Sequence, residues 1–334
     1  MNSQTSNLSL TENITTIIRP PYFYISGFTG IPHIKYYYVF LSLVYIVTLM
    51  GNTFVMFVIS MDRSLQSPKY IAVFNLALTD VCGTTAMVPM LLDMFLFNRQ
   101  FISYNQCLTS HFFVVIFHIM QSFNLTILSY DRLVAICCPL RYSMLISNRS
   151  IFQLTGAAWV LAVLVVLICI GLITRLSFCG SVVINSFFCD HYLLYSLAAP
   201  CSDVLPNRVM SNLIPCLVLY IPMIFIIASY ICIIHALFTI TLPQDRHRAI
   251  KTCTAHLMLV AIYYLPMNIT YLFVSFIPSN IRILNLSLTS VLPPMLNPII
   301  YVLKTEEFKV SAKRLLKRVA QRAVGPLMLT SRTK

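Results

Sequence analysis

Charged side chains are scarce in this chain, and the acidic ones are scarcest. Only 10% of the 334 residues are charged and 58% are hydrophobic, with a mean hydropathy of +0.81. Soluble domains are about one quarter charged, so a soluble globule of this size would lack the charges to cover its surface. With 8 glycines and 17 prolines, the chain is neither collagen-like nor of low complexity. The composition excludes a disordered chain, a coiled coil and an ordinary cytosolic enzyme, and it indicates an integral membrane protein.

Seven stretches are long and apolar enough to cross a bilayer as helices, which takes about 20 residues. Six contain no Asp, Glu, Lys or Arg, and the other carries only Asp80 and Asp93. The fifth is long enough for two spans, but no turn or charge divides it, so one tilted helix is expected. We predict an all-α membrane protein built as a seven-transmembrane helix bundle over residues 36–303. The predicted spans are residues 36–60, 70–97, 107–130, 151–174, 209–244, 252–281 and 283–303.

The basic residues predict which side of the membrane each end of the chain occupies. Of the 23 Lys and Arg residues, 17 lie in the tail and in the connections after the first, third and fifth spans, and 6 lie elsewhere. Because basic residues favour the cytoplasmic side, residues 1–35 are predicted to be extracellular and residues 304–334 cytoplasmic. The formal charge of +13 would then face anionic membrane lipid, and nucleic acid is not an expected partner. The predicted location is the plasma membrane.

The tail has the pattern of a short amphipathic helix. Thr305 can cap its first turn, which holds two glutamates, and Gly325 with Pro326 would end it. Apolar residues recur at helical spacing between basic ones, so an eighth helix is expected to lie on the inner leaflet. The apolar positions are Phe308, Ala312, Leu315, Leu316 and Val319.

The predicted extracellular segments carry glycosylation sequons and cysteines. Asn7 and Asn13 each begin an Asn-x-Ser/Thr sequon. Of the 11 cysteines, four lie outside or at the outer rim, where disulfides can form. They allow three pairings, and geometry favours a bond that joins the top of the third helix to the loop after the fourth, holding that loop as a lid. These four are Cys107, Cys179, Cys189 and Cys201.

An acidic residue at membrane depth is costly, so Asp80 is a candidate functional residue. One interpretation is a protonated or hydrogen-bonded acid that faces the interior of the bundle. The other is a cation or proton site with Asn52, Gln121 and Asn297 nearby, in which Asp80 and Gln121 would bind a sodium ion. No other metal or cofactor is expected.

Five runs of sequence, spread from the first span to the seventh, form a distinctive set. The longest extends from Ser129 to Tyr142 and includes Asp131-Arg132; the others are residues 51–52, 76–80, 251–256 and 294–301. Together they resemble the odorant receptors, a branch of the rhodopsin-like G-protein-coupled receptors. The Asp-Arg and Asn-Pro-x-x-Tyr elements are common to rhodopsin-like receptors, whereas the long Tyr-Asp-Arg run and the Thr-Cys-x-x-His element are specific to odorant receptors. The opening Ser26-Gly27-Phe28 with Gly30-Ile31-Pro32 resembles the class I branch.

The resemblance implies a switch at the inner end of the bundle. Arg132 would hold the inactive state through Asp131 and then engage a heterotrimeric G protein of the stimulatory, olfactory type, which raises cyclic AMP. Two tyrosines would swing inward to support it, and two further residues would flank the movement of the sixth helix. The tyrosines are Tyr230 and Tyr301, and the flanking residues are Lys251 and His256. Asn297 is the remaining switch residue.

The resemblance also implies two disulfides, Cys107 with Cys189 and Cys179 with Cys201. Gln121 stands where the family usually has Glu, which removes one charge from the proposed sodium site.

Odorants would bind among the outer halves of the helices. Counting back from Arg132 by helical turns places His111 and His118 on the inward face of the third span. His118 is either an odorant anchor or a hydrogen-bond partner of a neighbouring helix. The outer half of the sixth span has no Lys or Arg, which favours neutral amphiphilic ligands. The predicted ligand-binding residues are Val114, Val115, His118, Ile119, Ile214, Val218, Met267, Asn268, Tyr271 and Ser287.

The function that the sequence favours is therefore that of an odorant receptor. A rhodopsin-like receptor for a small ligand that is not an odorant is the main alternative. A transporter is less favoured, because the sequence shows no repeated halves and no relay of intramembrane charges. An enzyme would need paired carboxylates or a nucleophile with its base at membrane depth, and none is convincing.

Overall fold

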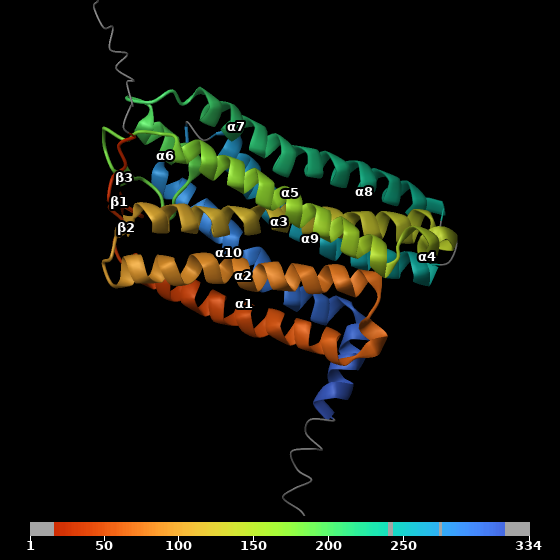
Figure 1. The fold of residues 1–334 in the computed structure, drawn as a ribbon. Helices are drawn as coiled ribbons and strands as arrows, with labels where there is room; N and C mark the ends of the chain where they lie inside the picture. Colours follow the sequence, from red (N-terminus) through yellow and green to blue (C-terminus); the bar gives the residue numbers. More distant parts are fainter. Residues whose placement is uncertain (1–16, 240–242, 274–275, 318–334) are drawn as a thin grey trace, which may run out of the picture.

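The computed structural model describes residues 17–239, 243–273 and 276–317. In this part of the chain, seven helical spans are long and apolar enough to cross a membrane, and they lie side by side in one bundle (Figure 1). The seven-helix prediction is therefore confirmed. The spans are α1 (Lys35–Met61), α2 (Pro68–Leu96), α3 (Tyr104–Cys137), α5 (Asn148–Thr174), α7 with α8 (Leu205–Thr239), α9 (Pro243–Leu272) and α10 (Ser279–Lys304).

The sixth span ends earlier than the sequence predicted. The apolar stretch continues to residue 281, but α9 ends at Leu272. Phe276 and Ile277 belong to a turn in which both backbone N–H groups donate to the carbonyl of Phe273. Hydrophobicity is uniform across this turn, so it did not mark the boundary, whereas the backbone hydrogen bonds do.

The long fifth span is one membrane-crossing element, but its middle is wound more widely than an α-helix. α7 (Leu205–Pro215) is followed by a π-helical segment, η3 (Cys216–Tyr220), and then by α8 (Ile221–Thr239). Pro222 has no N–H to donate to the preceding turn. Ser122 of α3 donates its hydroxyl to the carbonyl of Val218 in that turn, which ties the π segment to α3.

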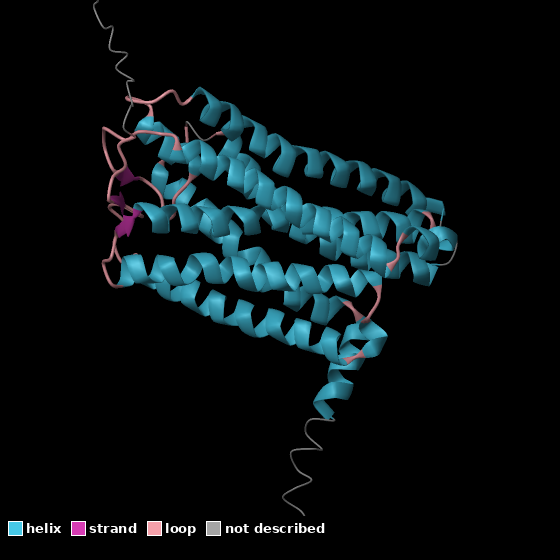
Figure 2. Ribbon diagram, viewed as in Figure 1, coloured by secondary structure: helices cyan, strands magenta, loops and turns pink. Residues whose placement is uncertain are grey.

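The end of the bundle at which α1 begins carries a small sheet, drawn in magenta in Figure 2. β1 (Tyr22–Ile25) is its central strand, antiparallel to β2 (Phe101–Ser103) and parallel to β3 (Val183–Ile184). The sheet thus joins the segment before α1, the start of α3 and the long loop after α5. That loop also contains the short helix α6 (His191–Ala198).

Two disulfides fix the same loop. Cys107 at the start of α3 is bonded to Cys189 just before α6, with 5.6 Å between their Cα atoms. Cys179 is bonded to Cys201, with a Cα separation of 6.2 Å. Together with the sheet, these bonds hold the loop across the outer end of the bundle.

The inner end holds three short elements and a further helix. The short elements are η1 (Arg63–Leu65), η2 (Pro139–Arg141) and α4 (Tyr142–Leu145). The tail helix, residues 306–317, follows α10 and turns away from the bundle axis (Figure 1).

The apolar stripe of the tail helix packs on the protein, not only on lipid. Phe308, Ala312 and Leu315 are buried in the inner core beside the ends of α1 and α2, and Leu316 is exposed. The expected amphipathic helix is therefore present, and three of the four described positions of its apolar stripe pack against the inner core. Val319 and the expected end at residues 325–326 lie outside the described residues.

Two of the distinctive sequence runs meet where α1 packs on α10. A Cβ atom on Gly51 would lie 2.8 Å from Cγ of Pro298, so only glycine allows this approach. The neighbouring Asn52 donates its amide to the carbonyl of Pro294, at 2.9 Å. Gly51 and Asn52 therefore set how closely the first and seventh spans can pack.

Candidate functional site

A cavity of about 320 Å³ lies in the outer half of the bundle, beneath the loop that carries α6. Its wall is formed by α3, the α7–α8 span, α9, α10 and the loop itself. Small-molecule pockets typically have volumes of about 300–1,000 Å³, so this one suits a small ligand.

Most of the predicted ligand-binding residues line this outer cavity. Asn268 and Ser287 do not. The amide of Asn268 donates to the carbonyl of Tyr264, at 2.7 Å, and the hydroxyl of Ser287 pairs with that of Tyr37 on α1, at 2.6 Å. The helical period put both on inward faces, but each is held by a polar partner away from the cavity. The predicted residues that do line it are Val114, Val115, His118, Ile119, Ile214, Val218, Met267 and Tyr271.

His118 bridges two helices. Its Nδ1 contacts the carbonyl of Val114, at 2.7 Å, and its Nε2 contacts the hydroxyl of Ser290 on α10, at 2.8 Å. Both ring nitrogens are therefore used within the protein. This arrangement matches the interpretation of His118 as a partner of a neighbouring helix.

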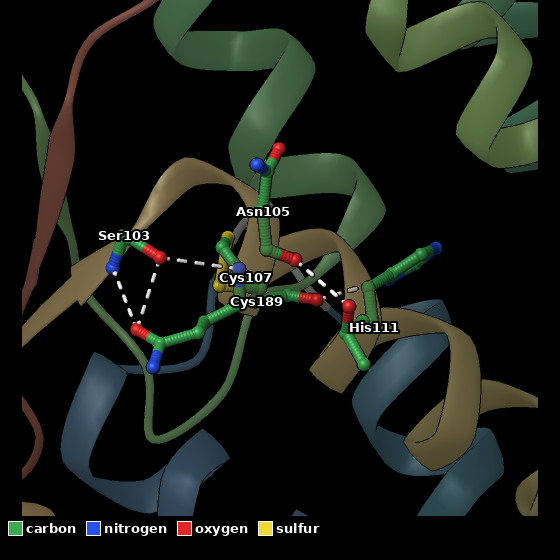
Figure 3. Close-up of a disulfide and its surroundings, with 7 residues drawn as sticks. Ser103, Asn105, Cys107, His111 and Cys189 are labelled. Atoms are coloured by element: carbon green, nitrogen blue, oxygen red, sulfur yellow. Dashed lines mark hydrogen bonds between the residues drawn. A yellow bond between two sulfur atoms is a disulfide. The ribbon is translucent and has the colours of Figure 1, made fainter.

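His111 connects the cavity to the loop above it. Its Nδ1 lies 2.9 Å from the carbonyl oxygen of Cys189, beside the Cys107–Cys189 disulfide (Figure 3). The start of α3 is fixed in the same place by a capping box, in which Ser103 and Gln106 bond each other's backbone N–H groups. The disulfide and this hydrogen bond together hold the loop as a lid.

The lid and the start of α10 add charged groups to the cavity wall. Arg282 is only 8% exposed, and its guanidinium donates to the carbonyl of Asn185, at 2.8 Å. Asp190 accepts from the N–H of Tyr192 at the start of α6, and burial raises the pKa of its carboxyl group. Arg282 was not among the predicted ligand-binding residues, because it reaches the cavity from the first turn of the seventh span and not from the sixth. The sequence signal that could have indicated Arg282 was its position four residues after Pro278, at the start of the seventh span.

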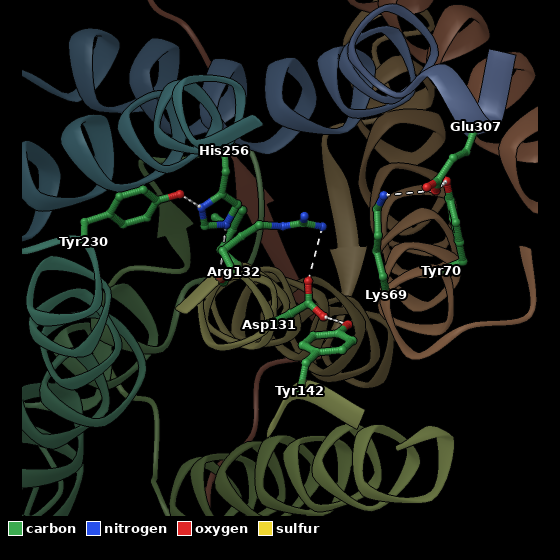
Figure 4. A network of polar contacts seen from close by, with 9 residues as sticks. Lys69, Tyr70, Asp131, Arg132, Tyr142, Tyr230, His256 and Glu307 are labelled. Atoms are coloured by element: carbon green, nitrogen blue, oxygen red, sulfur yellow. Dashed lines mark hydrogen bonds and ion pairs between the residues drawn. The ribbon is translucent and has the colours of Figure 1, made fainter. Parts of the chain in front are cut away.

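A second cavity, of about 750 Å³, lies at the inner end of the bundle. Among the predicted switch residues, Arg132, Lys251 and His256 line it. The guanidinium of Arg132 lies 3.2 Å from the Asp131 carboxylate, which also accepts a hydrogen bond from the Tyr142 hydroxyl, at 2.7 Å (Figure 4). Asp131 is 1% exposed, so its two partners balance the cost of burying its charge.

Tyr230 and His256 form a second link, between α8 and α9. His256 Nε2 lies 3.2 Å from the carbonyl of Leu125 on α3, and because a carbonyl only accepts, this nitrogen carries the hydrogen. Nδ1 is then an acceptor and takes the hydrogen of the Tyr230 hydroxyl, at 2.7 Å (Figure 4). Three helices therefore meet at one imidazole next to Arg132.

On the far side of Arg132, the tail helix closes the inner cavity. Glu307 lies 3.5 Å from the ammonium group of Lys69 and accepts a hydrogen bond from the Tyr70 hydroxyl, at 2.9 Å (Figure 4). The Lys69 charge and then the Tyr70 hydrogen bond lower the pKa of Glu307 below its usual value. Glu307 is therefore ionised at neutral pH and links the tail helix to α2.

Comparison with known proteins shows to which family the protein with these two cavities belongs. A family model described as olfactory receptor matches residues 41–319, which begin within α1 and include all of the described tail helix. The chain belongs to the olfactory receptor family. Human olfactory receptor 1D2 is 35% identical to this receptor over 280 residues, covering 84% of this chain and 89% of its own. Human olfactory receptor 2AT4 is 30% identical over 300 residues, covering 89% and 93%.

The fold of this olfactory receptor is shared with a solved receptor structure. Squid rhodopsin superposes with a TM-score of 0.68 over 87% of this chain and 88% of its own, at 18% identity. The likeness shows the rhodopsin fold. With the family match, it makes the chain a multi-pass plasma membrane protein and a receptor, not an enzyme. The assignment to the class I branch stays a prediction.

Between the two cavities, this receptor has a buried polar layer around Asp80. The amide of Asn297 donates to one carboxylate oxygen of Asp80, at 2.6 Å, and Gln121 interacts with the same carboxyl group. Three buried oxygens from three helices accept no hydrogen bond from the described residues: Oδ1 of Asn52, of Asp80 and of Asn297. Oxygen atoms of this kind are the ligands that hard cations prefer.

Three predicted site residues lie beyond what the structure describes. Asn7 and Asn13 precede residue 17, and the side chain of Tyr301 is outside the described part of α10. The glycosylation and the inward swing of Tyr301 therefore stay predictions.

Proposed function

We propose that this receptor binds small odorants in its outer cavity and activates a stimulatory, olfactory-type G protein at its inner cavity, which raises cyclic AMP. The observation that carries the proposal is that both cavities belong to the same helices: α3 and α9 line the outer cavity around His118 and Met267 and the inner one around Arg132 and His256. A movement of α9 relative to α3 therefore changes both cavities.

A ligand activates such a bundle only if it binds the active arrangement more tightly than the resting one. In the resting arrangement, Arg132 is paired with Asp131, and His256 ties α9 to α3. Opening the inner cavity requires α9 to leave Leu125, so that the C-terminal helix of a G-protein α subunit can reach Arg132.

Pro266, in the interior of α9, is a suitable pivot for this movement. Pro266 removes one backbone hydrogen bond from the helix interior. Its carbonyl accepts from the amide of Asn285 on α10, at 2.7 Å, and from the hydroxyl of Thr270, at 3.1 Å. Thr270 also lines the outer cavity, so a ligand there contacts the helix one turn from the pivot.

The test is a cyclic AMP assay in cells that express the receptor with a stimulatory olfactory G protein. A panel of volatile and water-soluble odorants should contain agonists, and Arg132→Ala should abolish their response while surface expression is retained. If Arg132→Ala signals normally, the switch is misassigned. A response confined to ligands that are not odorants would favour the alternative receptor function.

We also propose that the layer around Asp80 binds a sodium ion. The support is a set of three buried oxygens, on Asn52, Asp80 and Asn297, that have no hydrogen-bond partner among the described residues. These residues would hold the ion and link α1, α2 and α10 at this depth of the bundle. Replacing sodium by potassium in the buffer should lower the melting temperature of the purified receptor, and Asp80→Asn should remove this difference; equal melting temperatures for the wild type would rule the site out.

A further inference from the structure

The hydrogen-bonding groups of the outer cavity are unevenly used. His118, deep in the cavity, has a protein partner at each ring nitrogen. His111 and His191, at the lid, do not: among the described residues, Nε2 of His111 is buried without a hydrogen-bond partner, and the buried ring of His191 has only a contact of poor hydrogen-bond geometry with the backbone of Asn207. Both residues line the cavity, and they are 1% and 6% exposed. Unpartnered buried polar atoms are costly and rare in folded proteins, so this cluster points to a ligand.

The two imidazoles face one another. Their ring centroids are 6.0 Å apart and their planes are inclined by 29°. One comes from α3 and the other from α6 of the lid, so a group placed at the edges of both rings, where the nitrogens lie, would contact the bundle and the lid at once. Figure 3 shows the His111 ring extending away from the Cys107–Cys189 disulfide.

The hydrogen bond that His111 Nδ1 makes determines whether its Nε2 is a hydrogen-bond donor or acceptor. Nδ1 contacts the carbonyl oxygen of Cys189, which only accepts, so Nδ1 carries the hydrogen. In the neutral ring, Nε2 then presents a lone pair and requires a donor. A carboxylate or an ether has no hydrogen to offer at this position.

His191 supplies the complementary group. Burial, followed by the nearby His111 ring, lowers the pKa of His191 to about 4, although Asp190 and the backbone of Asn207 oppose this effect. The ring is therefore neutral at physiological pH, with one N–H and one lone pair. A ligand oxygen that donates to His111 can thus accept from His191.

We infer that His111 and His191 form the headgroup subsite of the outer cavity, and that it takes a hydroxyl group on an otherwise apolar ligand. A hydroxyl donates one hydrogen bond and accepts others, which matches this pair, and the wall below offers Val114, Val115 and Leu286 to a hydrocarbon chain. The inference rests on the proposed ligand-binding role of the outer cavity and adds the chemical class of the ligand.

Neither fixed charge in the wall changes this assignment. Arg282 donates one of its five N–H groups to the carbonyl of Asn185, and the carboxyl group of Asp190 lies close enough to interact with its charge. A carboxylate ligand would in addition face the lone pair of His111. The subsite therefore selects neutral alcohols over acids.

The test measures the melting temperature of the purified receptor with primary alcohols from hexanol to decanol, each paired with its isomeric methyl ether. The ether keeps the size and the acceptor but loses the donor. Leaving a buried acceptor unpaired costs on the order of 1–2 kcal/mol, so each alcohol should bind about tenfold more tightly than its ether.

Two variants of His111 separate recognition from the attachment of the lid. His111→Asn keeps an N–H where Nδ1 donates to Cys189 but has no distal acceptor, whereas His111→Gln places an oxygen where Nε2 lies and loses the lid bond. We expect His111→Asn to bind alcohol and ether equally and His111→Gln to keep the preference. His191→Phe retains the ring contacts with His111 and Tyr195. It should weaken the binding of alcohol and ether alike and leave the preference unchanged, because both ligands carry the oxygen that accepts from His191.

The subsite is overturned if the wild type binds no alcohol better than its ether, or if His111→Asn keeps the full preference. Failure of the proposed function is distinct. In that case the alcohols raise the melting temperature through His111, but no member of the panel raises cyclic AMP in cells.

Discussion

At the scale of single residues, Asp131 depends on two partners of different kinds. Arg132 supplies charge, and Tyr142 supplies a neutral donor that stays protonated, because burial and the bond to Asp131 raise the pKa of its hydroxyl well above the usual value. The salt bridge is thus oriented by a side chain from outside the membrane-spanning helix.

Replacing Tyr142 by Phe should therefore increase activity without ligand. The variant removes the donor to Asp131 and keeps the ring, so the Asp131–Arg132 pair is held less firmly in the resting arrangement. Loss of a hydrogen bond that stabilises the resting arrangement by about 1 kcal/mol should increase the ratio of active to resting receptor roughly fivefold. Basal cyclic AMP, normalised to surface expression, checks this; an unchanged basal level would show that Tyr142 does not restrain the switch.

Gly27 and Gly30 provide a matched pair within one sequence run. Both have positive φ, +61° and +69°, but a Cβ on Gly27 would lie 2.2 Å from the Phe95 ring and one on Gly30 would meet nothing within 4 Å. Both Ala variants carry the same backbone strain, of about 1–2 kcal/mol. Gly27→Ala should lower the melting temperature of the purified receptor clearly more than Gly30→Ala; equal losses would mean that the Phe95 contact is easily relieved.

At the scale of elements, the tail helix is held by an electrostatic contact as well as by its apolar stripe. Asp62, between α1 and η1, receives hydrogen bonds from Ser311 and Ser64 and lies 3.6 Å from Arg314. Several contacts together lower the pKa of Asp62 from 3.8 to about 2, and the hydrogen bond from Ser311 contributes most. A depressed carboxyl pKa stabilises the folded state above the unfolded pKa, and this stabilisation is lost as the pH falls from about 3.8 towards 2.

Replacing Asp62 by Asn should loosen the tail helix at neutral pH. Hydrogen exchange of residues 306–317 should become faster, while that of α2 stays the same. Asp93→Asn is the control, because its partner Arg99 forms an exposed pair that contributes little. Faster exchange in both variants, or in neither, would remove Asp62 from this role.

At the scale of the whole molecule, seven spans require the two ends of the chain to lie on opposite sides of the membrane. The distribution of basic residues predicts that the N-terminus lies outside, and both disulfides and the sheet would then lie in the extracellular space, where disulfides persist. The inner cavity, with Arg132 and Lys251, would face the cytoplasm.

Epitope tags test this orientation. A tag before residue 17 should bind antibody on intact cells, and a tag after residue 317 should bind only after permeabilisation. Removal of the sequons at Asn7 and Asn13 should abolish N-glycosylation. Detection of both tags on intact cells would contradict an odd number of spans.

The sequence by itself determined the number of spans, because a bilayer requires about 20 apolar residues for each crossing and charges are excluded from its core. It also indicated the inward face of α3 around His118, since the helical period is fixed by backbone geometry. It could not show that Ser287 turns to Tyr37, that Arg282 reaches the outer cavity, or that the tail helix packs on α1 and α2. These depend on which polar or apolar group a neighbouring helix presents at that depth, and only the packing of the bundle decides that.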